Sequence, residues 1–311
     1  MRFLDQDAVR GALPWDRLIP AIREVFASGC EVPPRTVHTM QVPGEPDGTL
    51  LLMPAWQGGK SLVVKTAIVM PGNGARGLPA VSAVVLAFDG RTGEPRALLD
   101  GGEVTARRTA ATSALAADLL ARQDAAHLLI VGAGRIAANL ASAHCSVRQY
   151  RRVSIWARRP EAAKALATSL RALAPEVVAA ETLEAAARDA DVISCATLSR
   201  EPLVLGAWLK PGAHVDLVGA YRHDMRETDD AAVARAGVIY VDTYEGALAE
   251  AGDILQPMAS GAITRAHISG ELAELCRGTG PRRPDDAAIT LFKSVGTAIE
   301  DYAAASLALD G

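Results

Sequence analysis

The stretch LLIVGAGRIAANL, residues 128–140, decides the fold, because an apolar strand-like run passes through a glycine-rich turn into a helix-like pattern. Gly132, Gly134 and Ala137 match the pattern GxGxxG/A of dinucleotide-binding βα units. The first glycine permits the tight turn, the second lets the backbone approach a pyrophosphate, and the alanine keeps the helix close to the strand. The segment therefore predicts a dinucleotide site, and a glycine-rich turn without a ligand is the alternative.

The helix after this turn begins with Arg135 and Ile136. Free N–H groups and a partial positive charge at a helix N-terminus favour phosphate binding. We therefore expect both residues to take part in holding the coenzyme.

Strand-like and helix-like segments alternate around the turn. The strand-like runs are HLLIV (127–131), RVSIW (152–156), EVVAA (176–180), DVISC (191–195), AHVDLVGA (213–220) and VIYVD (238–242). This rhythm is typical of βαβ units. It predicts an α/β fold with a Rossmann-type, doubly wound and mostly parallel sheet.

The first hundred residues follow a different pattern, in which short β-like runs are separated by turn clusters after a helix around residues 14–28. These runs are LLLMPAW (50–56), KSLVVKTAIVM (60–70), PAVSAVVLAFDG (79–90) and EPRALLD (94–100). They predict an antiparallel meander. A helix is expected over 105–123, and a last helix over 294–309 has no strand after it, so we expect it to complete the first domain. The predicted domains are 1–117 with 293–311, and 118–292.

Two arginines indicate which coenzyme the turn binds. A site that prefers NAD places Asp or Glu at the end of the second strand, where it accepts the ribose 2′-hydroxyl. Here the strand is followed by Arg158 and Arg159, whose guanidinium groups suit a 2′-phosphate. The sequence therefore predicts NADPH, with NADH as the alternative.

Composition excludes several classes of protein. The formal net charge is -4 and no basic stripe is present, which argues against nucleic acid as a partner. The longest apolar runs are too short to span a membrane, and the N-terminus lacks the apolar region of a signal peptide. Four scattered cysteines without a CxxC motif favour the reducing cytoplasm, and the six histidines form no metal-binding pattern.

Three basic residues of the first hundred or so are candidates for holding a small acidic substrate. Arg35 follows a Pro-Pro pair, Lys65 interrupts an apolar strand, and Arg108 lies in the helix that leads into the nucleotide domain. Each, taken singly, is more often an exposed surface charge. For Lys65, alternation along the strand does not settle which face it occupies.

The chain resembles the ornithine cyclodeaminase/mu-crystallin family over essentially its whole length. The resemblance is carried by VKTAIVMPGNGARGLPAV (64–81), DGGEVTARRTAATSALA (100–116), the VGAG turn and ITLFKSVGTAIEDYAAA (289–305). It implies a substrate-binding and dimerisation domain, built from the N-terminal part and the last helix, with a Rossmann domain inserted. A homodimer is expected with it.

The resemblance also implies roles for individual residues. Arg35, Lys65 and Arg108 would surround the substrate carboxylate, and Thr109 would contact the coenzyme phosphates. The residues expected on the nicotinamide side are Thr197, Val218, Gly219 and Ser294.

Two departures from the cyclodeaminase pattern favour a reductase. The proton-transferring Asp that cyclodeaminases carry after GG or GA is Tyr221 here. The residue that bears a hydroxyl after the family's Gly-Leu-x is Ala80 here, although Ser82 is nearby. The stretch DLVGAYRHDMRETDD (216–230) looks more like the ketimine reductase branch. A reductase needs a carboxylate clamp and an oriented nicotinamide, but less proton transfer than a cyclodeaminase.

The expected activity is therefore NAD(P)H-dependent reduction of Δ1-pyrroline-2-carboxylate to L-proline, and of the six-membered Δ1-piperideine-2-carboxylate to L-pipecolate. Lys65 would help to bind the carboxylate and would orient or protonate the imine nitrogen. Three alternatives stay open: ornithine cyclodeamination, reductive amination as in alanine dehydrogenases, and a crystallin-like protein that binds NADPH without turnover.

Overall fold

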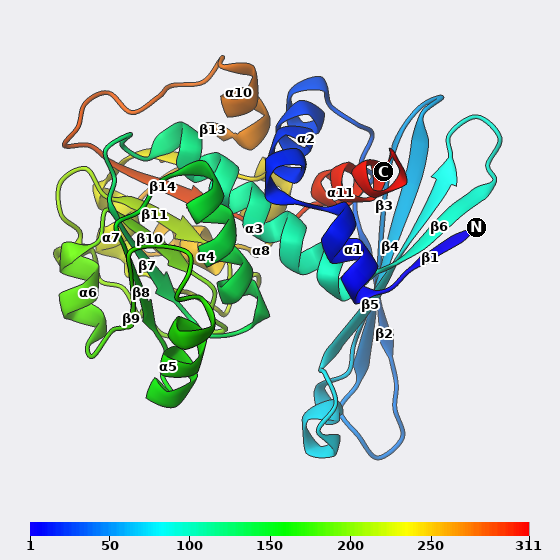
Figure 1. Cartoon of the computed structure of the whole chain (residues 1–311), viewed down its shortest axis with the longest axis horizontal. Helices are drawn as coiled ribbons and strands as arrows, with labels where there is room; N and C mark the ends of the chain where they lie inside the picture. The colour runs from blue at the N-terminus through cyan, green and yellow to red at the C-terminus, as the bar shows by residue number, and fades with distance from the viewer. Residues whose placement is uncertain (311) are drawn as a thin grey trace. The chain divides into compact units, whose positions relative to one another are not determined.

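The computed structural model describes residues 1–310, except for the side chain of Asp310, and divides into two compact units (Figure 1). The first unit comprises Met1–Arg108 and the C-terminal segment from Thr297 onward. The second unit is Thr109–Gly296. Helix α3 (Gly101–Leu120) crosses the division, which falls between Arg108 and Thr109.

The first unit is built on a six-stranded sheet with the order β1-β6-β5-β4-β3-β2. Its strands are β1 (Arg2–Leu4), β2 (Thr36–Met40), β3 (Gly48–Gln57), β4 (Ser61–Val69), β5 (Val81–Asp89) and β6 (Pro95–Asp100). The neighbours from β2 to β6 pair antiparallel, as the predicted meander requires. Its other elements are α1 (Gln6–Ala12), α2 (Trp15–Ser28), the 3-10 turn Pro71–Arg76 and α11 (Ala298–Asp310).

The two faces of this sheet differ because side chains alternate along each strand. On β4, Ser61, Val63, Lys65 and Ala67 are buried, whereas the residues between them are partly or fully exposed. Helix α11 packs on β3 and β4 and also contacts α2. The face of the sheet that bears Lys65 is therefore the buried one, which answers the question that alternation alone left open.

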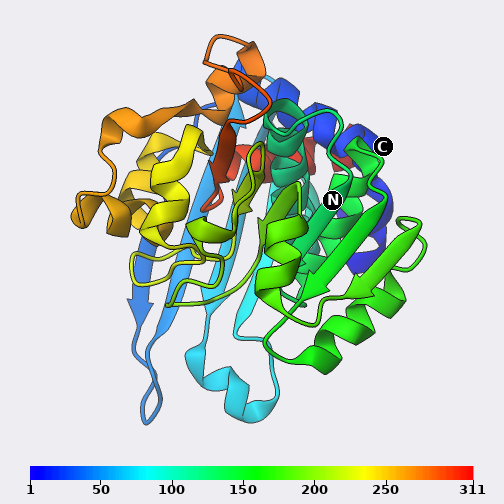
Figure 2. The same ribbon diagram turned by 90° about the vertical axis from the view of Figure 1, so that its left-hand side faces the viewer.

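The second unit holds an eight-stranded sheet with the order β13-β12-β14-β11-β10-β7-β8-β9, and all of its pairs are parallel. The strands are β7 (His127–Val131), β8 (Arg152–Trp156), β9 (Glu176–Ala179), β10 (Val192–Cys195), β11 (His214–Leu217), β12 (Ala236–Val241), β13 (Ile268–Glu271) and β14 (Ile289–Lys293). The helices are α4 (Arg135–Val147), α5 (Pro160–Ser169), α6 (Leu183–Asp189), α7 (Asp230–Arg235), α8 (Tyr244–Glu250), α9 (Gly252–Ala259) and α10 (Leu272–Arg277). This architecture, coloured green to orange in Figure 2, confirms the predicted α/β class.

The order of the strands fixes where a ligand binds. From β7 the chain runs through α4 to β8 and through α5 to β9, and it then returns to the other side of β7 as β10. The strand order therefore reverses between β7 and β10. Open parallel sheets bind ligands at the carboxyl ends of their strands at such a reversal.

Burial explains why this sheet forms. All five residues of β7 are buried, as are all four of β10 and of β11. Strands covered on both faces read as continuous apolar runs, and this is the pattern that made HLLIV recognisable. Within residues 1–310, no helix combines the length and the apolar character needed to cross a lipid bilayer.

Three details differ from the sequence prediction. Strand β1 pairs parallel with β6, so the first sheet is more than a meander. Strands β2, β13 and β14 were not predicted, and β14 lies between β11 and β12. The last helix begins at Ala298 rather than at Ser294. Gly296 has φ 86°, and the Oδ2 atom of Asp242 accepts the N–H groups of Val295 and Gly296, so these residues turn before the helix starts.

Candidate coenzyme and substrate sites

Glycine is needed at the two positions of the turn after β7 for different structural reasons. Gly132 has φ 130°, and a Cβ there would lie 2.8 Å from the carbonyl oxygen of Ala196, so the chain itself requires glycine. A Cβ on Gly134 would meet no atom within 4 Å. Gly134 is also the N-cap residue of α4 and offers no side chain to the N–H groups of the first turn. The second glycine thus leaves open space next to the first-turn N–H groups of α4, to which no cap side chain binds, and this fits a bound phosphate.

A pocket of about 450 Å³ opens beside this turn. Its lining combines the glycine turn with the end of β8 and the loop after β10, and comprises Gly132, Ala133, Gly134, Trp156, Ala157, Arg158, Arg159, Ala162, Ala196, Thr197, Leu198, Ser199 and Leu203. Arg158 and Arg159 are exposed, and the lining residues within 1–310 include no carboxylate. These residues fit a dinucleotide with an extra phosphate on its ribose. Arg135, at the start of α4, is exposed, and Ile136 is half-buried.

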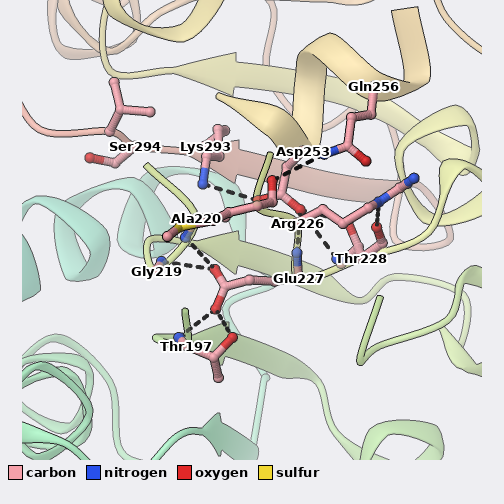
Figure 3. A network of polar contacts seen from close by, with 12 residues as sticks. Thr197, Gly219, Ala220, Arg226, Glu227, Thr228, Asp253, Gln256, Lys293 and Ser294 are labelled. Atoms are coloured by element: carbon pink, nitrogen blue, oxygen red, sulfur yellow. Dashed lines mark hydrogen bonds and ion pairs between the residues drawn. The ribbon is translucent and has the colours of Figure 1, made fainter. Parts of the chain in front are cut away.

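Glu227 joins the loops that follow β10 and β11 (Figure 3). Its Oε1 atom accepts the backbone N–H of Thr197 at 2.6 Å and the hydroxyl of the same residue at 2.7 Å. Its Oε2 atom accepts the N–H of Gly219 at 2.8 Å and that of Ala220 at 3.4 Å. Thr197 and Gly219, expected on the nicotinamide side, are therefore bound to one carboxylate, and Val218 lies directly between Gly219 and β11.

Two further buried charged residues, Asp253 and Lys293, hold Glu227 in place. The Oδ1 atom of Asp253 accepts the N–H groups of Glu227 and Thr228 at 2.7 and 3.2 Å. Its Oδ2 atom accepts a hydrogen bond from Nζ of Lys293 at 3.1 Å, as Figure 3 shows. Burial and the negative charge of Asp253 raise the pKa of Glu227 to about 7, against the opposing effect of Lys293. Glu227, Asp253 and Lys293 were not predicted as site residues, whereas Thr197 and Gly219, which Glu227 binds, were.

Ser294 follows β14 and is buried. Its hydroxyl donates to Oδ2 of Asp242 at 3.0 Å. The same oxygen accepts the two N–H groups that follow, so Asp242 fixes the turn before α11. The hydroxyl of Ser294 is therefore hydrogen-bonded to Asp242 in this structure.

In the first unit, Lys65 and Arg108 meet at the carboxylate of Asp301. Nζ of Lys65 lies 2.7 Å from Oδ2 of Asp301, and Nε of Arg108 donates to Oδ1 at 3.1 Å. Nη1 of Arg108 also donates to Glu300. All four side chains are buried, and Lys65 is only 4% exposed. The structure thus brings two of the three predicted cations together around two carboxylates that sequence reasoning missed.

The ionisation of this cluster follows from its burial. Burial lowers the pKa of Lys65 to about 8, and the positive charge of Arg108 acts in the same direction, whereas Asp301 raises it. Burial works against ionisation of Asp301, but Lys65 and Arg108 outweigh it and hold the pKa of this carboxyl below its usual value. Lys65 is therefore a cation at neutral pH that releases its proton more readily than an exposed lysine does.

Arg35 lies one residue before β2 and is half-buried. The register pairs Thr36 with Leu52, and Met53 with Lys65 on the next strand. Continuing this register by one residue places Arg35 in the row of Met53 and Lys65, beyond the end of β2. Thr109 is buried in α3 beside Arg108.

The missed carboxylates had a signal in the sequence. Glu300 and Asp301 form an acidic pair within an otherwise apolar and alanine-rich helix, and such a pair is seldom buried without cationic partners. For Glu227 the sequence offered no comparable signal, because it lies in a loop with several other charged residues. Within residues 1–310, no group of three or more His, Cys, Asp and Glu side chains is arranged to hold a metal ion.

Comparisons with known proteins agree with this fold. The family model described as ornithine cyclodeaminase/mu-crystallin family matches residues 2–310. A Δ1-pyrroline-2-carboxylate reductase of Paracoccus denitrificans is 42% identical over 98% of this chain and 95% of its own length.

Two solved structures share the fold over almost the whole chain. The Δ1-pyrroline-2-carboxylate reductase of Thermococcus litoralis, in complex with NADH and L-proline, superposes with a TM-score of 0.92 at 36% identity and covers 100% of this chain and 97% of that one. An archaeal alanine dehydrogenase dimer with bound NAD has a TM-score of 0.89 at 29% identity, with 99% and 94% covered. The resemblance seen in the sequence is confirmed: the chain belongs to the ornithine cyclodeaminase/mu-crystallin family.

Proposed function

We propose that this protein is an NAD(P)H-dependent ketimine reductase, which reduces the C=N bond of Δ1-pyrroline-2-carboxylate to give L-proline. The six-membered Δ1-piperideine-2-carboxylate, which would give L-pipecolate, belongs to the same substrate class. The observation that carries the proposal is the buried pair of Lys65 and Arg108 on the carboxylate of Asp301. The relatives named as Δ1-pyrroline-2-carboxylate reductases support the same reaction.

The substrate carboxylate is the group that the cations bind. Arg108 presents a planar guanidinium that suits a carboxylate, and Asp301 and Glu300 hold its orientation. Arg35, in the row of Lys65, supplies a further positive charge. Fixing the carboxylate in this way orients the ring and hence its C2 atom.

Reduction of the imine requires one hydride at C2 and one proton at nitrogen. The nicotinamide coenzyme supplies the hydride when it is bound. The Lys65 ammonium supplies the proton, because its pKa of about 8 lies close to neutral pH, where a general acid works best. Asp301 stays ionised and keeps Nζ of Lys65 in place, and the lysine then regains a proton from water.

The coenzyme is held by the second unit. The open position at Gly134 and the first-turn N–H groups of α4 receive the pyrophosphate, with Arg135, Ile136 and Thr109 beside it. Arg158 and Arg159 favour NADPH through its 2′-phosphate, and NADH is also accepted. The residues on the nicotinamide side are Thr197, Val218, Gly219 and Ser294.

The two units have separate tasks in this proposal. The first, with its C-terminal helix, binds the substrate and forms a homodimer, and the second binds the coenzyme. The scattered cysteines support a location in the reducing cytoplasm.

A homodimer is supported by the outward face of the first sheet. Val84 on β5 is 41% exposed and Ile68 on β4 is 37% exposed, on the face opposite Lys65. Exposed apolar residues on one face of a sheet are often part of a surface that contacts another protein. The related archaeal alanine dehydrogenase is a dimer.

No structural observation favours ornithine cyclodeamination. The position at which cyclodeaminases carry the proton-transferring Asp is Tyr221, whose side chain is 40% exposed. A crystallin-like protein without turnover would have no need of a buried lysine with a lowered pKa, because burying such a charge destabilises the fold.

A spectrophotometric panel tests the proposed function. The purified protein is given NADPH or NADH together with Δ1-pyrroline-2-carboxylate, Δ1-piperideine-2-carboxylate, pyruvate plus ammonia, or L-ornithine alone. We expect loss of reduced coenzyme with the cyclic imines, faster with NADPH, and formation of L-proline or L-pipecolate. Ammonia release from L-ornithine without added reductant would identify a cyclodeaminase, and coenzyme loss only with pyruvate and ammonia would identify a reductive aminase.

A further inference from the structure

Glu227 is an ionisable group that the proposed reaction does not use. It is completely buried, yet it belongs to a loop rather than to a regular element. All of its carboxylate contacts go to two loops, one after β10 and one after β11. These strands are neighbours in the sheet, and β10 is one of the two strands at which the strand order reverses.

The two loops are held together very closely. A Cβ on Gly219 would lie 2.0 Å from the carbonyl oxygen of Thr197 and 2.6 Å from Oε1 of Glu227. The backbones therefore approach as nearly as glycine allows. Thr197 lines the same pocket as Gly132 and Gly134, so the spacing of these loops shapes one wall of the coenzyme site.

The Glu227 carboxylate is needed because this contact leaves donors on both sides. The N–H groups of Thr197 and Gly219 and the hydroxyl of Thr197 all point at its two oxygens (Figure 3). A buried donor without an acceptor costs free energy, so the loops keep their spacing only while the carboxylate is present. Asp253 fixes the backbone of Glu227 itself.

The charge of this group has a second consequence. The charged and titratable groups that face Glu227 are Asp253 on α9, Lys293 on β14 and the thiol of Cys195 on β10. Asp253 and Lys293 form an ion pair and cancel each other's charge. An ionised Glu227 therefore leaves one net negative charge under the loops, and this charge favours the positively charged oxidised nicotinamide over the neutral reduced ring.

We propose that Glu227 is a positioning residue for the coenzyme, which sets the spacing of the loops after β10 and β11 and makes affinity depend on the redox state of the nicotinamide. This inference rests on the proposed function only in assuming that the chain binds a nicotinamide coenzyme. It does not depend on which imine is reduced.

Coenzyme binding without turnover tests the proposal. Dissociation constants of NADPH are measured by fluorescence titration, and those of NADP⁺ by competition, at about pH 6 and about pH 8, on either side of the pKa of Glu227. In the unmodified protein Glu227 ionises as the pH rises, so the ratio of the NADP⁺ constant to the NADPH constant falls several-fold.

Glu227→Gln replaces one acceptor oxygen by an NH2 group that faces N–H donors. We expect both dissociation constants to rise about tenfold, because buried donors lose their acceptor, and the ratio to lose its dependence on pH. Glu227→Asp keeps the charge but cannot span the two loops. It should weaken binding while the ratio still falls with rising pH.

Asp229→Asn is the matched control. Asp229 also caps backbone N–H groups, those of Gly206 and Ala232, but it makes no contact with Thr197 or Gly219 in the network described above. We expect a lower melting temperature with unchanged coenzyme constants. If Glu227→Gln and Glu227→Asp both bind NADPH and NADP⁺ as the unmodified protein does, Glu227 is not a positioning residue. A failure to reduce cyclic imines, with these binding results intact, would overturn the proposed function alone.

Discussion

At the scale of single residues, the protein depends on charges buried where water cannot stabilise them. Lys65 stands in a strand whose other buried residues are small or apolar, and its ammonium is retained by Asp301. The sequence showed the three cations but not what surrounds them, because Arg108 and Asp301 are separated by 193 positions in the chain. No local sequence pattern predicts a contact between residues so far apart in the chain. Lys65 and Arg108 reach Asp301 only because α11 packs on the sheet.

Replacement of Lys65 tests its place in the substrate site. Lys65→Met keeps the length of the buried side chain but removes the charge and the proton. We expect kcat/KM for Δ1-pyrroline-2-carboxylate to fall about a hundredfold, the usual contribution of a positioned general acid. Lys60→Met, at the exposed turn before β4, is the control and should leave kcat/KM within about twofold, since an exposed charge contributes little. Full turnover by Lys65→Met would remove Lys65 from the mechanism.

The lowered pKa of Lys65 predicts how binding depends on pH. Pyrrole-2-carboxylate is a suitable probe, since it keeps the ring and the carboxylate but has no imine nitrogen to titrate. The ammonium form is present below about pH 8 and is lost above it, so affinity should stay level up to about pH 8 and then weaken. Isothermal titration calorimetry measures the constant at each pH. An affinity that stays level to about pH 10, where an ordinary lysine titrates, would contradict the lowered pKa.

At the scale of elements, the glycine turn and the strands of the second unit could be predicted because each carries its own signal. The run HLLIV is buried on both faces and therefore apolar throughout, and the turn after it needs glycine for a local reason. Strands β1 and β13 span three and four residues, which is too short for a periodic pattern. The start of the last helix was wrong because Asp242, far away in sequence, holds the N–H groups before it.

The two glycines of the turn give a matched pair of substitutions. In Gly134→Val the Cβ of the new side chain would meet no other atom of the protein within 4 Å, so the melting temperature should stay the same. The affinity for NADPH should fall at least about tenfold, because the backbone can no longer approach the pyrophosphate. In Gly132→Val the positive φ and the close carbonyl of Ala196 should destabilise the fold by about 2 kcal/mol. Thermal melting and fluorescence titration separate the two effects. Equal loss of stability in both variants would mean that Gly134 serves the fold rather than the coenzyme.

At the scale of the whole molecule, two compact units share one chain, and the first is completed by a helix from the far end of the sequence. The last helix without a strand after it indicated this arrangement, and the family resemblance implied it as well. The sequence could not predict which residues lie exposed on the outward face of the first sheet, because their exposure depends on which strands become neighbours. Its apolar residues are what the proposed homodimer would cover.

A charge on that face tests the homodimer. Val84→Lys places an ammonium on the outward face of β5, opposite the side that bears Lys65. We expect the unmodified protein to sediment as a dimer and the variant as a monomer, because burying an unpaired charge in an interface is costly. Ser82→Lys places the same charge on the outward face beside Ile68 and should also give a monomer. An unmodified protein that sediments as a monomer at micromolar concentration would rule the proposed dimer out.

Transfer of a labelled hydride tests the central claim most directly. The protein is incubated with Δ1-pyrroline-2-carboxylate and NADPH that carries deuterium at the transferable position of the nicotinamide, and the product is examined by mass spectrometry and NMR. A reductase whose coenzyme delivers hydride to the imine carbon gives L-proline with one deuterium at C2. Unlabelled proline, or no proline at all, would contradict the account.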